Sequence, residues 1–263
     1  MTTTSAGKPK KRSWLDYVRA FGRAHQKAKV QLDSSMPLLE HLEELRQRLF
    51  KAFAALVVAT AISFAFAGPL VDFLSAPIGG RGALVSIEIT ENVAIFMRVS
   101  LLSGVVLSMP VIVYQVARFV LPGLTDRERR WLLLGVPFAS VLFLSGVAFT
   151  WYVMLPTAVP FLMNFLGIRT QVRPNNYFSF ATSLMFWIGL AFEMPLVVMF
   201  LAKLKFVRAS QLIQYWRYAV VAIAVVAAVI TPTVDPINMG LVMLPLGALY
   251  VISIVLAAIA GRD

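Results

Sequence analysis

Three glutamates stand within five positions, at Glu40, Glu43 and Glu44, shortly before the first long apolar run of the chain. The leucines around them recur at spacings of four, three and four residues, which places them on one face of a helix: Leu38, Leu42, Leu45 and Leu49. Such a helix lies along a membrane surface with its charged side chains on the polar face. Because anionic lipid repels carboxylates, this acidic spot beside Arg46 and Arg48 favours a receptor for a cationic ligand. The alternative is local pairing of Glu44 with Arg48, which is worth about 0.3–0.5 kcal/mol and accounts for one glutamate only.

A further acidic residue, Glu193, interrupts a stretch that is otherwise apolar enough to cross a membrane. Translocon-based scales assign roughly 2.5–3.5 kcal/mol to Asp, Lys or Arg at the centre of a spanning helix, so an intramembrane acid is a functional-site hypothesis by default. We expect Glu193 to face a groove that receives a polar residue of a partner helix. The alternative is a side chain that snorkels or bonds to a neighbouring helix of the same chain.

The other reactive residue types exclude several kinds of chemistry. The chain has no cysteine, which rules out a disulfide framework, Cys-ligated zinc and a thiol nucleophile. The two histidines, His25 and His41, both precede the first apolar run, so neither a histidine-rich metal centre nor an intramembrane Ser–His pair is expected. No glycine-lysine phosphate-binding loop is present. We therefore expect no enzyme, no metal and no cofactor.

The composition indicates an all-α integral membrane protein. Of 263 residues, 59% are hydrophobic and only 14% are charged, whereas about a quarter of the residues of a soluble domain are charged. A spanning helix needs about 20 apolar residues. The uncharged runs predict six spans, at about 52–71, 98–120, 131–154, 178–202, 217–231 and 237–259. Pro156 and Pro160 predict that the third span ends near Met154 and that a loop follows, and a tight turn through Pro232 and Pro236 joins the last two.

The positive charges predict the orientation. Of the 24 Lys and Arg residues, 20 fall before the first span, in alternate loops and at the C-terminus, and the other loops hold only Arg81, Arg98, Arg169 and Arg173. Because Lys and Arg are retained on the cytoplasmic side, both termini are predicted to be cytoplasmic. The net charge of +11 then reflects topology, and no nucleic-acid partner is expected. Residues 1–35 are predicted to be a basic cytoplasmic extension, disordered or interfacial, before a membrane domain, 36–263, that opens with an interfacial helix at 36–50.

Several short motifs occur in an order that resembles one family. The segment His41–Leu49, HLEELRQRL, resembles the N-terminal motif of TatC, the polytopic core subunit of the twin-arginine protein translocase. Further matches follow over roughly Met36 to Ala260: Ser75-Ala76-Pro77, Glu91, Pro110 to Val116, Phe119, Leu121 to Leu124, Glu128 to Arg130, Phe192 to Pro195, Thr231-Pro232 and Asp235-Pro236. The chain departs from the family pattern in its basic extension and at Gln47, Arg98 and Arg118.

The resemblance implies Sec-independent translocation of folded proteins, driven by the proton motive force, by a multi-pass protein of the bacterial cytoplasmic (inner) membrane. The family binds signal peptides that carry two consecutive arginines, and a guanidinium prefers bidentate carboxylate partners. By this resemblance Glu44 and Glu128 are the expected acceptors, brought together at the cytoplasmic face, although Glu128 alone would fit an ordinary mixed-charge loop. Phe119 is expected to pack against the apolar part of the signal peptide or inside the protein. Four arginines are expected either to orient the acids or to contact lipid phosphates: Arg46, Arg48, Arg129 and Arg130.

The resemblance also implies partners. We expect TatA/TatB-type single-span proteins in an oligomeric complex, membrane lipids, and a concave helical arrangement. Partner helices are expected at Glu193 and at the short segment Tyr218–Ile230 together with the helix after Pro236. A secondary transporter or channel for a small solute is the competing function, and it requires inverted repeats and several facing polar residues near the midplane. Ordinary turn chemistry is the alternative to the structural roles expected for Pro77, Glu91, Pro110 and Asp235.

Overall fold

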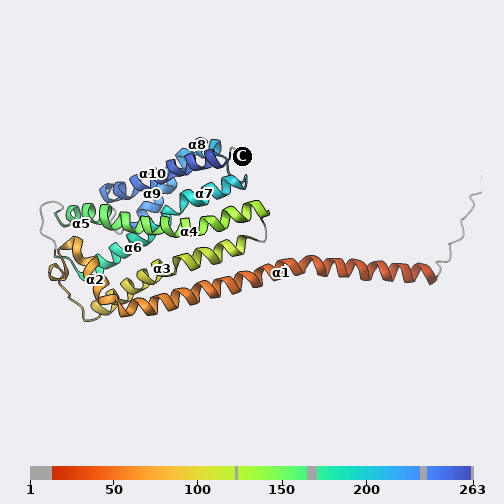
Figure 1. Cartoon of the computed structure of the whole chain (residues 1–263), viewed down its shortest axis with the longest axis horizontal. Helices are drawn as coiled ribbons and strands as arrows, with labels where there is room; N and C mark the ends of the chain where they lie inside the picture. Colours follow the sequence, from red (N-terminus) through yellow and green to blue (C-terminus); the bar gives the residue numbers. More distant parts are fainter. Residues whose placement is uncertain (1–13, 122–123, 165–170, 232–235, 262–263) are drawn as a thin grey trace, which may run out of the picture. The chain divides into compact units, whose positions relative to one another are not determined.

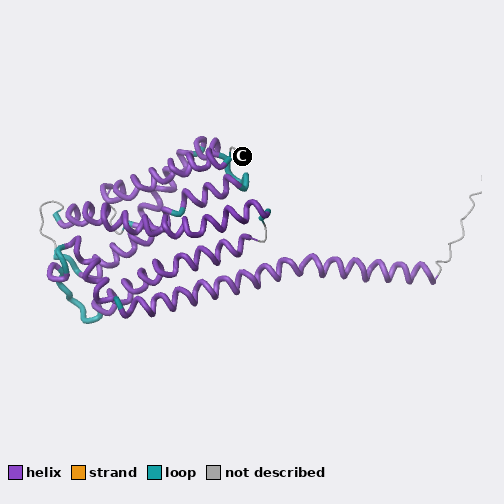
Figure 2. Tube along the Cα trace, viewed as in Figure 1, coloured by secondary structure: helices purple, strands orange, loops and turns teal. Residues whose placement is uncertain are grey.

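The computed structural model describes residues 14–121, 124–164, 171–231 and 236–261, leaving aside the side chains of 14–38, 126–127 and 237–238. Within these ranges the chain is helical, and the only paired extended backbone is one parallel bridge between Leu84 and Val172 (Figure 2). The predicted all-α class is therefore confirmed for the described residues. The chain divides into two compact units, residues 1–47 and residues 48–263.

Helix α1 (Trp14–Ala65) covers the residues of the predicted interfacial helix and of most of the predicted first span. In the first unit its leucine side chains are exposed, with Leu39 at 66% and Leu42 at 60%, as expected of an amphipathic helix whose apolar face the chain itself does not cover. The helix ends at Ala65, before the predicted end at residue 71. Pro69 explains this end, because its ring clashes with the carbonyl four residues earlier and it has no N–H to donate.

The second unit is a bundle of helices that lie side by side (Figure 1). Short elements gather at one end of this bundle, namely α2 (Ala67–Ser75), η1 (Ala76–Ile78), η2 (Arg81–Ala83) and α5 (Leu155–Met163), while α8 (Ala209–Gln214) lies at the other end. The core is apolar, and its most deeply buried large side chains are Phe143, Phe178, Leu155, Leu184 and Ile188. The other helices of this unit are α3 (Glu91–Val120), α4 (Asp126–Phe149), α6 (Pro174–Phe192), α7 (Met194–Lys203), α9 (Trp216–Ile230) and α10 (Pro236–Ala260).

Five helical segments in the described ranges are long and apolar enough to cross a membrane: Leu39–Ala65, Glu91–Val120, Glu128–Met163, Pro174–Lys203 and Met239–Ala260. They match five of the six predicted spans. The remaining prediction falls on α9, which has 15 residues and so measures about 22 Å at 1.5 Å per residue. This is shorter than the hydrocarbon layer of about 30 Å.

The third predicted span differs from the structure at its end. The chain does not leave the helix near Met154; it passes through a π-helical turn, η4 (Thr150–Met154), and continues as α5 to Met163. Pro156 stands in the first turn of α5, directly after the π-helical turn. The hydrogen-bond pattern changes at this point, which lets the helix continue through a residue that has no N–H to donate.

Helices α4 and α6 approach each other closely at two glycines. A Cβ atom built on Gly146 would lie 2.8 Å from the Cα of Gly189 and 2.9 Å from the carbonyl oxygen of Ile188. A Cβ atom on Gly189 would in turn lie 2.8 Å from a ring carbon of Phe143. Small residues that let backbones approach are the usual means by which helices associate in a bilayer, where burial from water contributes little.

Candidate functional site

Glu128 lies in the first turn of α4 and forms a capping box with Thr125. Its Oε2 accepts hydrogen bonds from the Thr125 backbone N–H at 2.9 Å and from Thr125 Oγ1 at 2.7 Å. No residue in the described ranges donates to its Oε1, so half of the carboxylate remains available to a ligand. Our sequence interpretation did not use Thr125, although the pattern Thr-x-x-Glu before an apolar run signals a capping box.

Three other predicted site residues accompany Glu128 where α3 ends and α4 begins. Phe119, in the last turn of α3, is half-buried, while Arg129 and Arg130 are exposed. In Figure 1 the end of α3 and the start of α4 lie at the end of the bundle where α7 ends and α8 begins. Arg129 and Arg130 are therefore accessible from outside the protein, and they follow Glu128 directly in the sequence.

The last two turns of α3 also bury polar atoms that lack partners in the described part of the chain. These atoms are Gln115 Oε1 and Arg118 Nε. The Arg118 guanidinium lies over the ring of Tyr114, with 5.7 Å between its central carbon and the ring centroid. Because buried polar groups in folded proteins are normally hydrogen-bonded, these two atoms are exceptions at this end of α3.

The predicted residues of the N-terminal segment fall on α1. Arg46 forms an ion pair with Glu43, so its charge is already balanced within the first unit. Glu44, also in the first unit, and Arg48, in the second, are both half-buried. Since Glu44 and Glu128 belong to different units, their expected meeting stays a prediction.

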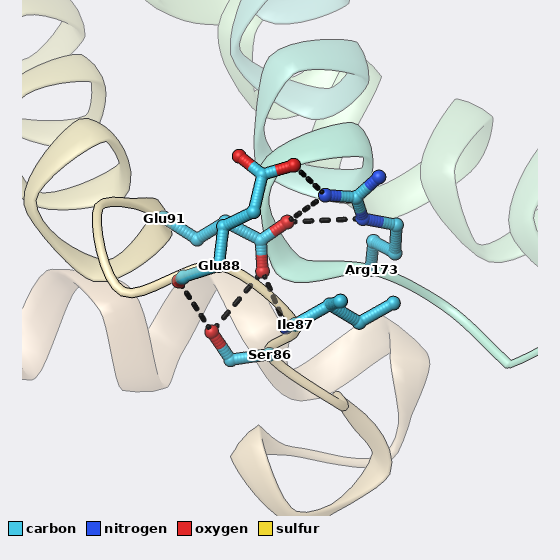
Figure 3. Close-up of polar contacts among 5 residues, drawn as sticks. All are labelled: Ser86, Ile87, Glu88, Glu91 and Arg173. Carbon is cyan, nitrogen blue, oxygen red and sulfur yellow. Dashed lines mark hydrogen bonds and ion pairs between the residues drawn. The ribbon is translucent and has the colours of Figure 1, made fainter.

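Glu91 forms the best-connected polar cluster in the described structure, at the start of α3 (Figure 3). Its side chain is 1% exposed. Oε1 accepts two hydrogen bonds from Arg173, from Nε at 3.0 Å and from Nη2 at 2.8 Å. Oε2 accepts the Ile87 backbone N–H and the Ser86 hydroxyl, each at 3.1 Å. This buried carboxylate is thus satisfied on both oxygens, which is what burial of a charge requires.

Arg173 joins two loops that lie far apart in the sequence. Besides Glu91, its Nη2 donates to Glu88 Oε1 at 2.6 Å, so one guanidinium serves two carboxylates. These two carboxylates raise the pKa of Arg173 above its ordinary value, Glu88 having the larger effect. The sequence indicated a structural role for Glu91, but it gave no partner, because Arg173 stands 82 residues away. Arg173 is therefore the principal structural residue of this cluster that sequence reasoning missed.

Further contacts fasten the same two loops. The Val85 N–H donates to the Val172 carbonyl at 3.3 Å beside the Leu84–Val172 bridge, and the Tyr177 hydroxyl donates to the Leu74 carbonyl at 2.7 Å. The predicted structural residue Pro77 lies close by in sequence, in the first turn of η1. Asp235, expected to organise the last turn, lies outside the described residues. We call the joined segments, residues 74–91 and 171–177, the outer cap.

Glu193 stands at a break between two helices. α6 ends at Phe192 and α7 begins at Met194, with Pro195 in its first turn. The Glu193 residue is 9% exposed, and its Oε1 has no hydrogen-bond partner among the described residues. The role expected for Glu193 in binding another helix stays a prediction. Pro110, also predicted to be structural, lies inside α3, which continues past it.

The fold and these sites define a class of protein. It is a polytopic helical membrane protein with acidic groups at the ends of its helices and one acid within a span. No group of three or more His, Cys, Asp or Glu side chains in the described ranges is placed to hold a metal ion.

Comparison with known proteins gives the family. The sequence profile described as Sec-independent protein translocase protein (TatC) matches residues 40–245. The chain is 37% identical to the Sec-independent protein translocase protein TatC of Deinococcus radiodurans, over 86% of this chain and 87% of that one. It is also 37% identical to the chloroplastic TATC of Arabidopsis thaliana, over 88% and 68% of the two chains. A crystal structure of the twin arginine translocase receptor TatC superposes with a TM-score of 0.74 at 33% identity, covering 84% of this chain and all of the other. This chain belongs to the TatC family and is a component of a protein translocase.

Proposed function

We propose that this chain is the receptor subunit of a twin-arginine translocase and binds signal peptides with paired arginines at its cytoplasmic face. The observation that supports this most directly is the Glu128 carboxylate, which the capping box holds in a fixed orientation with Oε1 available. A charge-assisted hydrogen bond from a guanidinium to a fixed carboxylate costs little ordering of the receptor. Glu44 is the second acceptor in this proposal, and the crystallised relative is itself named a receptor.

The proposed surroundings follow from the same elements. Phe119 contacts the apolar stretch of the signal peptide, since it is half-buried in the last turn of α3. Arg129, Arg130 and Arg48 contact lipid phosphates and orient the acids. Arg46 contributes less, because Glu43 already pairs with it.

The proposed topology has six spans and both termini in the cytoplasm of a bacterium, with the protein in the inner membrane. Five spans come from the long helices, and α9 is the sixth. The charge distribution supports this orientation. Basic residues stand in the last turn of α3, in the first turn of α4, before α8 and at the start of α9, namely Arg118, Arg129, Arg208 and Arg217. The outer cap then faces the other side of the membrane.

The proposed partners are TatA/TatB-type single-span proteins, in an oligomeric complex driven by the proton motive force. Their helices contact the break at Glu193, where a buried carboxyl oxygen lacks a partner, and the lipid-facing side of α9. Val221, Val225 and Val229 on α9 are 63%, 59% and 72% exposed and recur every four residues. A short helix with such a face favours association, because it does not match the bilayer thickness by itself.

Photocrosslinking with a signal peptide tests the receptor role. Glu128→Gln keeps the capping box, since a Gln carbonyl accepts the same two hydrogen bonds, but it removes the negative charge. We expect Glu128→Gln and Glu44→Gln each to weaken capture of an Arg-Arg peptide by about 10- to 100-fold, the range of a lost charge-assisted hydrogen bond. A Lys-Lys peptide should be captured poorly by the unaltered chain.

The matched control is Glu40→Gln, which removes an exposed acid of the same helix that carries Glu44. It should capture the Arg-Arg peptide normally, and all three variants should keep the thermal midpoint of the unaltered protein. Full capture by Glu128→Gln, or equal capture of both peptides by the unaltered chain, would refute the receptor proposal.

A further inference from the structure

We propose that the segment between α7 and α9, residues 203–218, binds the headgroups of anionic phospholipids. We call this segment the basic turn. In the topology proposed above, the basic turn faces the inner leaflet. The lipid binding itself does not depend on that topology, because it follows from the contacts, charge and exposure of the segment.

Most of the positive charge of the basic turn has no acidic partner among the residues that the structure describes. No Asp or Glu stands anywhere between Glu193 and Asp235, whereas four basic residues fall in that interval. Three of them, Lys205, Arg208 and Arg217, make no ion pair with any residue that the structure describes. A local excess of Lys and Arg at a membrane surface attracts anionic lipid.

Large apolar and aromatic side chains stand exposed beside these charges. Phe206 is 75% exposed, Tyr218 73%, and Tyr215 and Trp216 53% each. The Arg217 guanidinium lies 5.9 Å from the centroid of the Trp216 ring. Tyr and Trp beside basic residues at the start of an apolar helix are typical of the membrane–water interface. Since α9 begins at Trp216 and is short, these rings are drawn to headgroup depth.

The basic turn has a fixed shape. The Tyr250 hydroxyl on α10 donates to the Leu212 carbonyl at 2.6 Å, which holds α8 against α10. At the start of α8, the Arg208 N–H donates to Gln211 Oε1 at 2.9 Å. The basic groups are therefore presented from an ordered surface, so little conformational entropy is lost when a headgroup binds.

Lys205 occupies a backbone conformation that usually belongs to glycine. Its φ of 62° is the only positive value among the described non-glycine residues. The Lys205 N–H donates to the Ala202 carbonyl and the Phe206 N–H to the Leu201 carbonyl, each at 3.0 Å, which is the pattern of a Schellman motif with lysine at its left-handed position. Glycine adopts this conformation without strain, so the lysine side chain is retained at a cost to stability. An ammonium group needed at this surface accounts for that cost.

Charge complementarity indicates which ligand binds the basic turn. A twin-arginine peptide is cationic and is repelled by a cluster without acids, so the basic turn is not part of the proposed peptide site. A phospholipid with a net negative headgroup supplies both the anion for Lys205 and Arg208 and the acyl chains for Phe206 and Trp216. An acidic segment of a partner protein supplies the anion only.

The test uses the full chain in neutral detergent, titrated with phosphatidylglycerol, with phosphatidylcholine and with inorganic phosphate, and read by native mass spectrometry. Lys205→Gly should weaken phosphatidylglycerol binding about fivefold, the effect of removing one basic residue near a lipid surface. The same variant should raise the thermal midpoint, because glycine relieves the left-handed strain. Lys205→Arg, which keeps the charge and the strain, should bind as the unaltered chain does.

Arg81→Gln is the matched control, since it removes a basic residue from an outer loop where Asp72 already pairs with it. It should leave phosphatidylglycerol binding unchanged, and Lys205→Gly should leave Arg-Arg peptide capture unchanged. The proposal is overturned by equal binding of phosphatidylglycerol and phosphatidylcholine, by inorganic phosphate binding as tightly as phosphatidylglycerol, or by full lipid binding in Lys205→Gly. Failure of peptide capture in the unaltered chain would instead count against the receptor role alone.

Discussion

Gly146→Ala should destabilise the protein through the contact between α4 and α6. The added methyl group would lie 2.8 Å from the Gly189 Cα, 2.9 Å from the Ile188 carbonyl oxygen and 2.9 Å from Phe192 Cγ. Unstrained contacts of this kind are about 3.5–4.0 Å, so the two helices would have to separate by several tenths of an ångström. Two of these three atoms belong to backbone and cannot rotate away.

A control on the same helix isolates the packing contribution. A Cβ atom on Gly135 would meet nothing within 4 Å, so Gly135→Ala changes helix propensity alone and should stabilise α4 by up to about 1 kcal/mol. Gly146→Ala gains the same propensity but also overpacks the interface, which typically costs about 1–3 kcal/mol. The difference between the two variants in free energy of unfolding should therefore be about 1–3 kcal/mol, with Gly146→Ala the less stable.

Unfolding by sodium dodecyl sulfate in mixed micelles, followed by circular dichroism, measures this difference. Both variants should keep the helical content of the unaltered chain before the transition. If Gly146→Ala unfolds at the same detergent fraction as Gly135→Ala, the close approach of α4 and α6 does not contribute to stability and the packing argument is wrong.

Two further predictions concern the outer cap. Tyr177→Phe removes the hydroxyl that donates to the buried Leu74 carbonyl and should cost about 1 kcal/mol of unfolding free energy in the same detergent titration; an unchanged midpoint would show that water replaces the bond. Arg173→Gln leaves the buried Glu91 carboxylate without its cation and should speed hydrogen exchange of the backbone amides at 84–90. The control Arg81→Gln breaks an exposed pair with Asp72 and should not change that exchange. Equal exchange in both variants would mean that Arg173 does not hold the cap closed.

The long helices could be predicted from the sequence because the signal is local. Uncharged runs about 20 residues long are visible without any knowledge of contacts, and five of them match helices of spanning length. The ends were less predictable, because proline has opposite effects by position. Pro69 ends α1 at Ala65, four residues before the proline itself, whereas Pro156 fits in the first turn of α5. The break at Glu193 had a visible signal in Pro195, two positions later.

The polar sites divide in the same way. The capping box around Glu128 is a four-residue pattern and could have been found from the sequence alone. The Glu91–Arg173 pair could not, because each residue alone reads as a solitary charge in a loop, and only the packing of α3 against α6 brings them together. The left-handed conformation of Lys205 was equally hidden, since the signal that usually predicts it is a glycine.

The buried Glu91–Arg173 pair determines when the first loop can fold during synthesis of the protein. The ribosome makes Glu91 first, then all of α3, α4 and α5, and only afterwards the arginine that neutralises it. Until then the carboxylate must stay in water, because an unpaired charge is costly to bury. The loop before α3 therefore cannot take its final arrangement until Arg173, at the start of α6, has been made. A chain whose synthesis stops after α5 would lack Arg173, so the Glu91 carboxylate would have no guanidinium to balance its charge.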